Sequence, residues 1–374
     1  MNASLLPFIT KKIRSALAGL TLLFATFSAQ ADSGVVNVYN WAEYLASDTL
    51  PGFTRQTGIK VHYDTFDTND ILQAKLLTGK SGYDIVVPST HYASRFIQAG
   101  LLQKLDKSKF PNWKYLDPDI LALLEDVDPG NQYLIPWGMG TDALGYNIDK
   151  VKSIMGEDFN FASWENLFDP KIIAKLKTCG VSILDEPAQV FPAVLHYLGK
   201  DPNSSELEDY EEAFEVLKKI RPYIRQFSSS GYIDELASGD LCMVYGFNGD
   251  VMIAAHRARE AKQKFQVDFF TPPDGAPVFF DTMAITADAD NYDNAMAFIN
   301  YIETPQVHAD ITNEMFYANA NKEARKYVDP ELATNAAIYP PPEVSKHLFV
   351  IKSQPVKVVR MQTRLWAKLK TLRN

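Results

Sequence analysis

The chain of 374 residues is acidic, with a formal net charge of −9, and 46% of its residues are hydrophobic. This balance disfavours nucleic acid and anionic membrane surfaces as partners, while it permits a cationic ligand. A chain of this length exceeds one typical hydrophobic core and favours two domains of about 150 residues each.

The first 31 residues have the pattern of a secretory signal peptide. A cationic start precedes an apolar run over residues 16–27, and Ala29-Gln30-Ala31 is an A-x-A cleavage site. We therefore expect export, cleavage after Ala31 and a mature chain of net charge −12. A retained N-terminal anchor is the alternative. No later run reaches about 18 consecutive apolar residues, so the mature protein is expected to be soluble.

Hydrophobic periodicity predicts strands and helices that alternate along the exported part. The expected strands cover residues 35–39, 59–66, 83–88, 181–184, 241–245, 265–270 and 278–285. The expected helices cover residues 49–57, 69–77, 92–99, 188–198, 206–220, 249–262, 291–302 and 356–369. This order predicts an α/β fold with mainly parallel sheets and helices on both faces.

Capping residues and glycines add local detail to this pattern. Thr68 or Asn69, Ser89 and Asp290 are the expected N-caps of the helices that follow them. The glycine-rich run 138–145 lacks the spacing of a dinucleotide-binding loop, and we expect a turn there.

Cys179 and Cys242 are the two cysteines of the chain, and both lie in the exported part. An even pair in an oxidising compartment predicts a disulfide bond. Two free buried thiols are the alternative.

Three stretches place an aromatic ring close to a carboxylate at an end of an apolar run. They are Trp41-Ala42-Glu43-Tyr44, Phe247-Asn248-Gly249-Asp250 and Phe279-Phe280-Asp281. Aromatic faces and ionised carboxylates together suit an organic cation that must leave water. Trp41, Ser89 and Phe247 follow expected strands, and loops converge at the carboxyl ends of parallel strands. The pattern predicts a site for an ammonium ligand.

Signals for catalysis are weak along the sequence. It has no G-x-S-x-G elbow, no Walker A loop and no histidines at metal-ligand spacing. A secreted hydrolase with Asp250 and Asp281 as paired acid and base is an alternative, but no neighbouring residue supplies a nucleophile. We therefore expect a binding protein that is not an enzyme and uses no cofactor or metal.

Six motifs resemble segments of the periplasmic polyamine-binding proteins of bacterial ABC transporters, with the putrescine-binding subunits most similar. They are Val38-Tyr39-Asn40-Trp41-Ala42-Glu43-Tyr44, Tyr83-Asp84-Ile85-Val86-Val87-Pro88-Ser89, Gly145-Tyr146-Asn147, Gly199-Lys200-Asp201-Pro202-Asn203-Ser204, Phe279-Phe280-Asp281 and Phe316-Tyr317-Ala318-Asn319-Ala320-Asn321. The resemblance covers residues 36–370. It implies a two-lobed periplasmic-binding-protein fold, with crossover strands between the lobes and the ligand in the cleft.

The resemblance also implies a domain division and a function. Lobe 1 would hold residues 32–138 and 278–312, and lobe 2 residues 139–277 and 313–374. The protein would be a periplasmic monomer that captures a putrescine-like diamine by hinge closure and delivers it to ABC permease subunits in the membrane. A sensory protein that docks on a membrane receptor, and a binder of a modified amine, are the alternatives.

By the same resemblance, aromatic side chains surround the aliphatic part of the ligand, and Asp250 and Asp281 hold one ammonium group. The two cysteines likewise match the family's disulfide. The full set of expected ligand-binding residues is Trp41, Glu43, Tyr44, Ser89, Asp142, Gln189, Phe247, Asp250, Phe279, Asp281 and Tyr317.

Three positions depart from what the putrescine-binding subunits have in common. Ala42 stands in place of serine, Gln189 in place of a glutamate for the second amine, and Phe247 in place of the usual tryptophan. A neutral amide at position 189 weakens binding of a desolvated ammonium by about 1–3 kcal/mol. We hypothesise that Asp142 supplies the missing charge, or that the far end of the ligand is not a simple ammonium. A solvent-facing Asp142 is the alternative.

Overall fold

The computed structural model describes residues 34–125 and 127–372, so the expected signal peptide and its cleavage site lie outside the described residues. The strands are β1 (Val35–Trp41), β2 (Lys60–Phe66), β3 (Ile85–Val86), β4 (Ile135–Asn147), β5 (Val181–Ile183), β6 (Gln226–Phe227), β7 (Met243–Phe247), β8 (Val267–Phe270), β9 (Pro277–Ile285) and β10 (Phe349–Val350).

Helices surround these strands. They are α1 (Thr49–Thr57), α2 (Asn69–Leu76), α3 (Thr90–Gln98), α4 (Pro118–Leu124), α5 (Ile148–Met155), α6 (Glu165–Phe168), α7 (Pro170–Leu176), α8 (Pro187–Tyr197), α9 (Leu207–Ile220), α10 (Tyr232–Ser238), α11 (Asn248–Glu260), α12 (Tyr292–Ile302), α13 (Pro305–Met315), α14 (Pro330–Ala333), α15 (Pro342–Ser345) and α16 (Val356–Thr371). Single 3₁₀ turns lie at Lys107–Lys109, Pro111–Tyr115, Lys177–Cys179, Arg221–Tyr223 and Ala324–Lys326.

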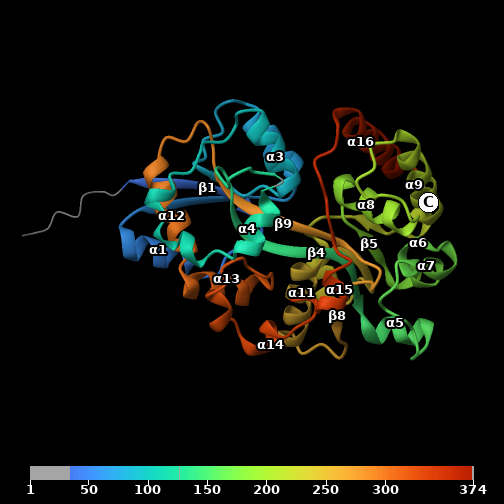
Figure 1. Ribbon diagram of the computed structural model, residues 1–374. Helices are drawn as coiled ribbons and strands as arrows, with labels where there is room; N and C mark the ends of the chain where they lie inside the picture. Colours follow the sequence, from blue (N-terminus) through green and yellow to red (C-terminus); the bar gives the residue numbers. More distant parts are fainter. Residues whose placement is uncertain (1–33, 126, 373–374) are drawn as a thin grey trace, which may run out of the picture. The chain divides into compact units, whose positions relative to one another are not determined.

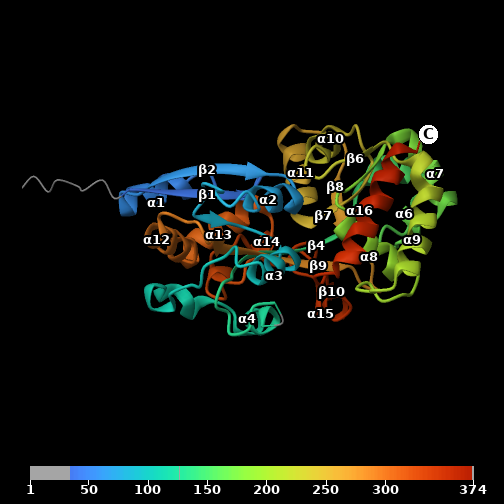
Figure 2. The ribbon, with the colours of Figure 1, turned by 90° about the horizontal axis from the view of Figure 1, so that it is seen from above.

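The strands form one mixed sheet that runs through two lobes. Its order is β2-β1-β3-β9-β4-β7-β5-β6, with β10 beside β9 and β8 beside β4. Figures 1 and 2 show β1, α1 and α12 in one lobe and α6, α7, α9 and α16 in the other, with β4 and β9 between them. The predicted two-lobed α/β fold is confirmed. Strand β1 pairs parallel with β2 and β3, β5 pairs parallel with β6 and β7, and β10 pairs parallel with β9. Strand β4 pairs antiparallel with β7, β8 and β9.

Strands β4 and β9 are the crossover strands. Near its start β4 pairs with β9, with Ile135 opposite Met283, and further along it pairs with β7, with Asp142 opposite Phe247. The last residue of β9, Ile285, pairs with Ile85 of β3. Strand β9 therefore runs from one lobe to the other, so its residues Phe279 and Asp281 lie between the two lobes.

Several predicted helix ends are confirmed and one cap is corrected. Helix α1 ends at Gly58, which has a φ of 77°, and the Thr68 hydroxyl caps α2 by accepting from the Ile71 N–H at 3.3 Å. The cap of α12 is Asn291, and the prediction of Asp290 was wrong because the Asp84 carboxylate holds the Asn291 N–H at 2.9 Å. Ser89 is the N-cap residue of α3, as predicted, although its hydroxyl makes no cap bond and donates to Asp281 instead.

The predicted turn at residues 138–145 was wrong, because this run is the middle of β4. Its glycines allow side chains from other elements to pack closely against the strand. A Cβ atom on Gly140 would lie 2.5 Å from Asn248 Oδ1, 2.6 Å from Phe279 Cζ and 2.8 Å from Tyr317 Cδ1. Glycine inside a strand commonly marks such a close approach of neighbouring groups.

We expect Gly140→Ala to lower the free energy of unfolding by about 1–3 kcal/mol, because the added methyl group overpacks this junction. Urea denaturation of a chain that begins at Asp32 measures the effect. Gly231→Ala is the matched control, since its Cβ would meet only the Ser228 hydroxyl, at 3.1 Å. A Gly140→Ala midpoint equal to that of the control would contradict the packing argument.

The predicted disulfide between Cys179 and Cys242 is confirmed, with the Cα atoms 5.4 Å apart. It joins the 3₁₀ turn before β5 to the residue that precedes β7. Among the described helices, none combines the length and the apolar character needed to cross a membrane.

Candidate functional site

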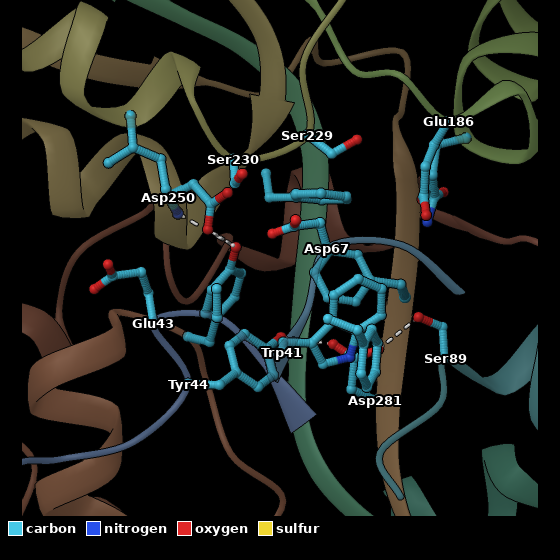
Figure 3. A pocket seen from close by; sticks show the side chains of 17 residues that line it. Trp41, Glu43, Tyr44, Asp67, Ser89, Glu186, Ser229, Ser230, Asp250 and Asp281 are labelled. Carbon is cyan, nitrogen blue, oxygen red and sulfur yellow. Dashed lines mark hydrogen bonds between the residues drawn. The ribbon is translucent and has the colours of Figure 1, made fainter. Parts of the chain in front are cut away.

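A cavity lies beside the crossover strands and receives residues from both lobes. It holds about 530 Å³ of empty space, the part open to solvent included. All the expected ligand-binding residues except Asp142 line it (Figure 3): Trp41, Glu43, Tyr44, Ser89, Gln189, Phe247, Asp250, Phe279, Asp281 and Tyr317. The other lining residues are Ala42, Phe66, Asp67, Glu186, Ser229, Ser230 and Ile233.

The aromatic residues form a continuous wall along the cavity. Neighbouring ring centroids are 6.5 Å apart from Trp41 to Tyr44 and 5.3 Å apart from Tyr44 to Tyr317. The wall continues at 5.9 Å to Phe279 and at 5.3 Å to Phe247. Trp41 ends β1 and Phe247 ends β7, so the carboxyl ends of strands in both lobes contribute rings. Such a wall suits an aliphatic chain that carries cationic ends.

Asp281 is the most buried carboxyl group on the β9 side of the cavity. Its two oxygens accept hydrogen bonds from the Tyr44 and Ser89 hydroxyls, each at 2.6 Å (Figure 3 draws the second). Desolvation raises the pKa of Asp281 to about 6, although these hydroxyl bonds act in the opposite direction. A carboxylate has about four acceptor positions, so an ammonium group can still bind it.

Asp250, in the first turn of α11, is held in the same way. Its oxygens accept hydrogen bonds from the hydroxyls of Tyr232 and Tyr317, each at 2.8 Å. Desolvation raises the pKa of Asp250 to about 6, and the two tyrosine bonds partly offset that increase. The negative charge on Asp250 also contributes to the raised pKa of Asp281, so the two carboxyls share one electrostatic environment.

Glu186 is an acidic residue that was not among the expected ligand-binding residues. It directly precedes α8, is buried, lines the cavity, and accepts a hydrogen bond from the Asn69 N–H at 3.3 Å. Burial raises the pKa of Glu186 to about 8. Figure 3 shows Glu186 and Asp250 at opposite sides of the cavity. No signal in the sequence would have selected it, because Glu186 has an extended backbone just before α8 and so lies outside the helical periodicity.

Two further polar groups in the cavity wall lack protein partners. Gln189 Oε1 and Ser229 Oγ are buried and make no hydrogen bond with any described residue. Buried polar atoms are rarely left unsatisfied, so both atoms are suited to a polar ligand. The Glu186 side of the cavity therefore offers one carboxyl and one free amide oxygen.

The comparisons with known proteins agree with this geometry. Residues 52–340 match the family of bacterial extracellular solute-binding proteins. This chain belongs to that family.

Two relatives match over nearly their full length. The chain is 46% identical over 365 residues to the putrescine-binding periplasmic protein PotF of Escherichia coli (strain K12), covering 97% of this chain and 99% of that protein. It is also 46% identical over 363 residues to the putrescine-binding periplasmic protein SpuD of Pseudomonas aeruginosa (strain UCBPP-PA14), covering 96% of this chain and 99% of the relative.

A solved structure shows the same fold. The spermidine/putrescine ABC transporter substrate-binding protein PotD from Streptococcus pneumoniae has a TM-score of 0.73 at 27% identity. The match covers 90% of this chain and 98% of that one. The two-lobed fold is thus shared with this substrate-binding protein.

Asp142 does not reach the cavity of this solute-binding protein. It is fully buried, so the solvent-facing alternative was wrong, and its carboxyl lies within hydrogen-bond distance of the Tyr245 hydroxyl. Burial raises the pKa of Asp142 to about 8. The Tyr245 hydroxyl also lies 3.1 Å from the Gln189 carbonyl oxygen. Asp142 therefore contacts α8 through Tyr245, and Glu186 is the acid beside Gln189.

Glu43 lines the cavity at its rim, where another residue engages it. Its carboxylate lies 2.9 Å from the Arg257 guanidinium, which also lies 2.8 Å from Asp234. Glu43 comes from the loop after β1 and Arg257 from α11, so the ion pair links the two lobes. Both partners are partly exposed, and pairs of this kind contribute about 1 kcal/mol or less.

Proposed function

We propose that this protein binds a linear polyamine in its interlobe cavity and delivers it to the permease of an ABC importer. The observation that carries the proposal is a wall of aromatic rings with carboxyls at opposite sides, the partly buried Asp250 and the buried Glu186 (Figure 3). Ammonium groups at both ends of a diamine can each meet a carboxylate, while the methylene chain lies against the rings. The putrescine-binding relatives support the choice of ligand.

Each end of the ligand has its own set of groups in this proposal. Asp250 and Asp281 hold one ammonium, as the sequence predicts. Glu186 and Gln189 hold the other, with the Gln189 amide oxygen accepting a hydrogen bond and Glu186 supplying the charge. Ala42 and Phe247 replace groups common among putrescine binders without removing a charge. The glutamate absent from position 189 is thus replaced one helical turn earlier.

The remaining features of the proposal follow the family. The chain is exported, residues 1–31 are removed, and the mature protein works in the periplasm as a monomer. Residues 32–138 with 278–312 and residues 139–277 with 313–374 form the two lobes, which close on the ligand about β4 and β9. Its relatives are binding proteins of transporters, and we propose no catalytic activity for this one.

Calorimetric titration of the mature protein tests the proposal. The panel holds putrescine, spermidine, agmatine, butylamine as the monoamine, and γ-aminobutyrate as an amine with a carboxylate. We expect at least one diamine or triamine to bind with a micromolar Kd or tighter, which is about −8 kcal/mol. γ-Aminobutyrate should bind weakly, because its carboxylate would face Glu186. Absence of binding by every polyamine in the panel would refute the function.

The variant Glu186→Gln tests which end of the ligand Glu186 binds. We expect it to weaken putrescine binding by about ten- to hundredfold, since it removes the charge at the second ammonium. Butylamine, which has no second ammonium, should change by less than about threefold. Asp142→Asn is the matched control, because Asp142 is an equally buried acid with its pKa also near 8. Equal losses for putrescine and butylamine would show that Glu186 does not face the second amine.

A further inference from the structure

A fully buried ion pair lies behind the aromatic wall, against crossover strand β4. Its members are His308 on α13 and Glu303, which directly follows α12, and neither side chain is exposed to solvent. His308 Nδ1 lies 3.1 Å from Glu303 Oε2, and His308 Nε2 lies 2.7 Å from the Trp137 carbonyl oxygen. The ring therefore joins α13 to β4.

Both ring nitrogens of His308 face hydrogen-bond acceptors. A carbonyl oxygen cannot donate, so Nε2 carries a proton, and an ionised Glu303 requires a second proton on Nδ1. Burial by itself lowers the pKa of His308, but the Glu303 charge and the Trp137 carbonyl together raise it above its ordinary value. The Asn321 amide N–H₂ donates to Glu303 Oε2 at 3.3 Å and to the Glu303 carbonyl oxygen at 2.8 Å.

Contacts lead from this pair to the candidate ligand site. The Trp137 ring is fully buried and stacks on Tyr44, with centroids 6.4 Å apart and planes 13° apart. The Tyr44 hydroxyl in turn donates to Asp281 at 2.6 Å. The position of β4 at Trp137 therefore decides where Tyr44, and through it Asp281, can lie. Trp137 itself does not line the cavity.

We propose that His308, as a buried imidazolium, is a positioning residue for the ammonium site: it fixes β4 at Trp137 and thereby the Tyr44–Asp281 pair. The proposal rests on the proposed polyamine-binding function. Only a ring with protons on both nitrogens donates to the Trp137 carbonyl and the Glu303 carboxylate at once, so without it at least one of them is a buried acceptor that has lost a partner. The strand then shifts to regain hydrogen bonds, because leaving such groups unsatisfied is costly.

A double-mutant cycle tests whether His308 acts through Tyr44. We expect His308→Gln to weaken putrescine binding by about tenfold in the wild-type background and by less than about twofold when Tyr44 is already Phe. Ile311→Val on the same helix is the control. Ile311 is equally buried, but its apolar side chain cannot form a hydrogen bond with Trp137. It should lower the Tm and leave the affinity unchanged. Additive effects of His308→Gln and Tyr44→Phe would overturn the proposal.

The protonation state is tested on the wild-type protein, so it does not depend on the folding of a variant. In ¹⁵N-histidine NMR of the ligand-free protein at pH 7.5, we expect the His308 imidazole to carry protons on both nitrogens. Its signal is assigned by its loss in His308→Gln or, if that variant does not fold, in His308→Gln/Glu303→Gln. A neutral ring at position 308 would overturn the imidazolium. Failure of wild-type protein to bind any amine would refute the function, while the NMR result would still report on His308.

Discussion

Asp281→Asn is expected to weaken putrescine binding by about a hundredfold or more. Truncating one partner of a buried charge pair costs about 2–5 kcal/mol, because the ammonium group then enters a desolvated site without a countercharge. Asp281 is only 2% exposed, so water cannot take its place. The asparagine keeps the shape of the side chain and an oxygen that can accept from Tyr44. Calorimetric titration with putrescine measures the loss.

Thermal unfolding without ligand separates loss of binding from loss of fold. The Tm of ligand-free Asp281→Asn should not fall. Desolvation of the Asp281 carboxyl raises its pKa to about 6, so the ionised group destabilises the folded wild-type protein. Asp142→Asn again serves as the control and should keep the Kd within about threefold of wild type. Asp281→Asn with wild-type affinity would show that the ammonium is held elsewhere.

Putrescine affinity is expected to rise with pH, by at least about a hundredfold between pH 5 and pH 8. The pKa values of Asp250 and Asp281 are raised to about 6, and that of Glu186 to about 8, in each case chiefly by desolvation. The carboxyls must be ionised to pair with ammonium groups. For each carboxyl, the affinity therefore falls about tenfold for every pH unit below the pKa of that carboxyl. Binding at pH 7 should release protons.

Titrations in buffers of different ionisation enthalpy measure these protons directly. Glu186→Gln should abolish most of the release seen near pH 7.5 and leave the dependence near pH 6, which belongs to Asp250 and Asp281. A Kd that is constant from pH 5 to pH 8, with no proton release, would contradict the raised pKa values.

The stability of the ligand-free protein should depend on pH in the opposite direction. A carboxyl with a folded pKa above its unfolded value binds more protons in the native state between about pH 4 and the folded pKa. For Asp250, Asp281 and Glu186 this contribution to stability is therefore lost as the pH rises from about 4 through 6 to 8. Putrescine restores it, so the ligand-induced increase in Tm should be larger at pH 8 than at pH 5.

Much of the fold was predictable because its signals are local. The ends of α1 and α2 follow from Gly58 and Thr68, whose backbone or hydroxyl acts within one helical turn. Strand β4 was not predictable in this way, because its glycines have the composition of a turn. Their role depends on Asn248, Phe279 and Tyr317, which approach from distant parts of the chain.

Some residues of the candidate site were also predictable from the sequence, and others were not. The aromatic and acidic residues near strand ends could be selected from the sequence, because rings and carboxylates are recognisable and strand ends gather at one edge of a sheet. The acid beside Gln189 could not, since Glu186 and Asp142 are both carboxylates on neighbouring elements. Only their positions in the folded chain decide that Glu186 lines the cavity while Asp142 meets Tyr245.

The sequence by itself determined the α/β class, the ends of many helices, the disulfide partners and the chemical type of the site, because each depends on residue type and short-range spacing. The tertiary structure alone decided the path of β4, the engagement of Glu43 by Arg257 and the burial that raises the carboxyl pKa values. Desolvation and ion pairing depend on what surrounds a group in space, and those neighbours come from residues far apart in the chain.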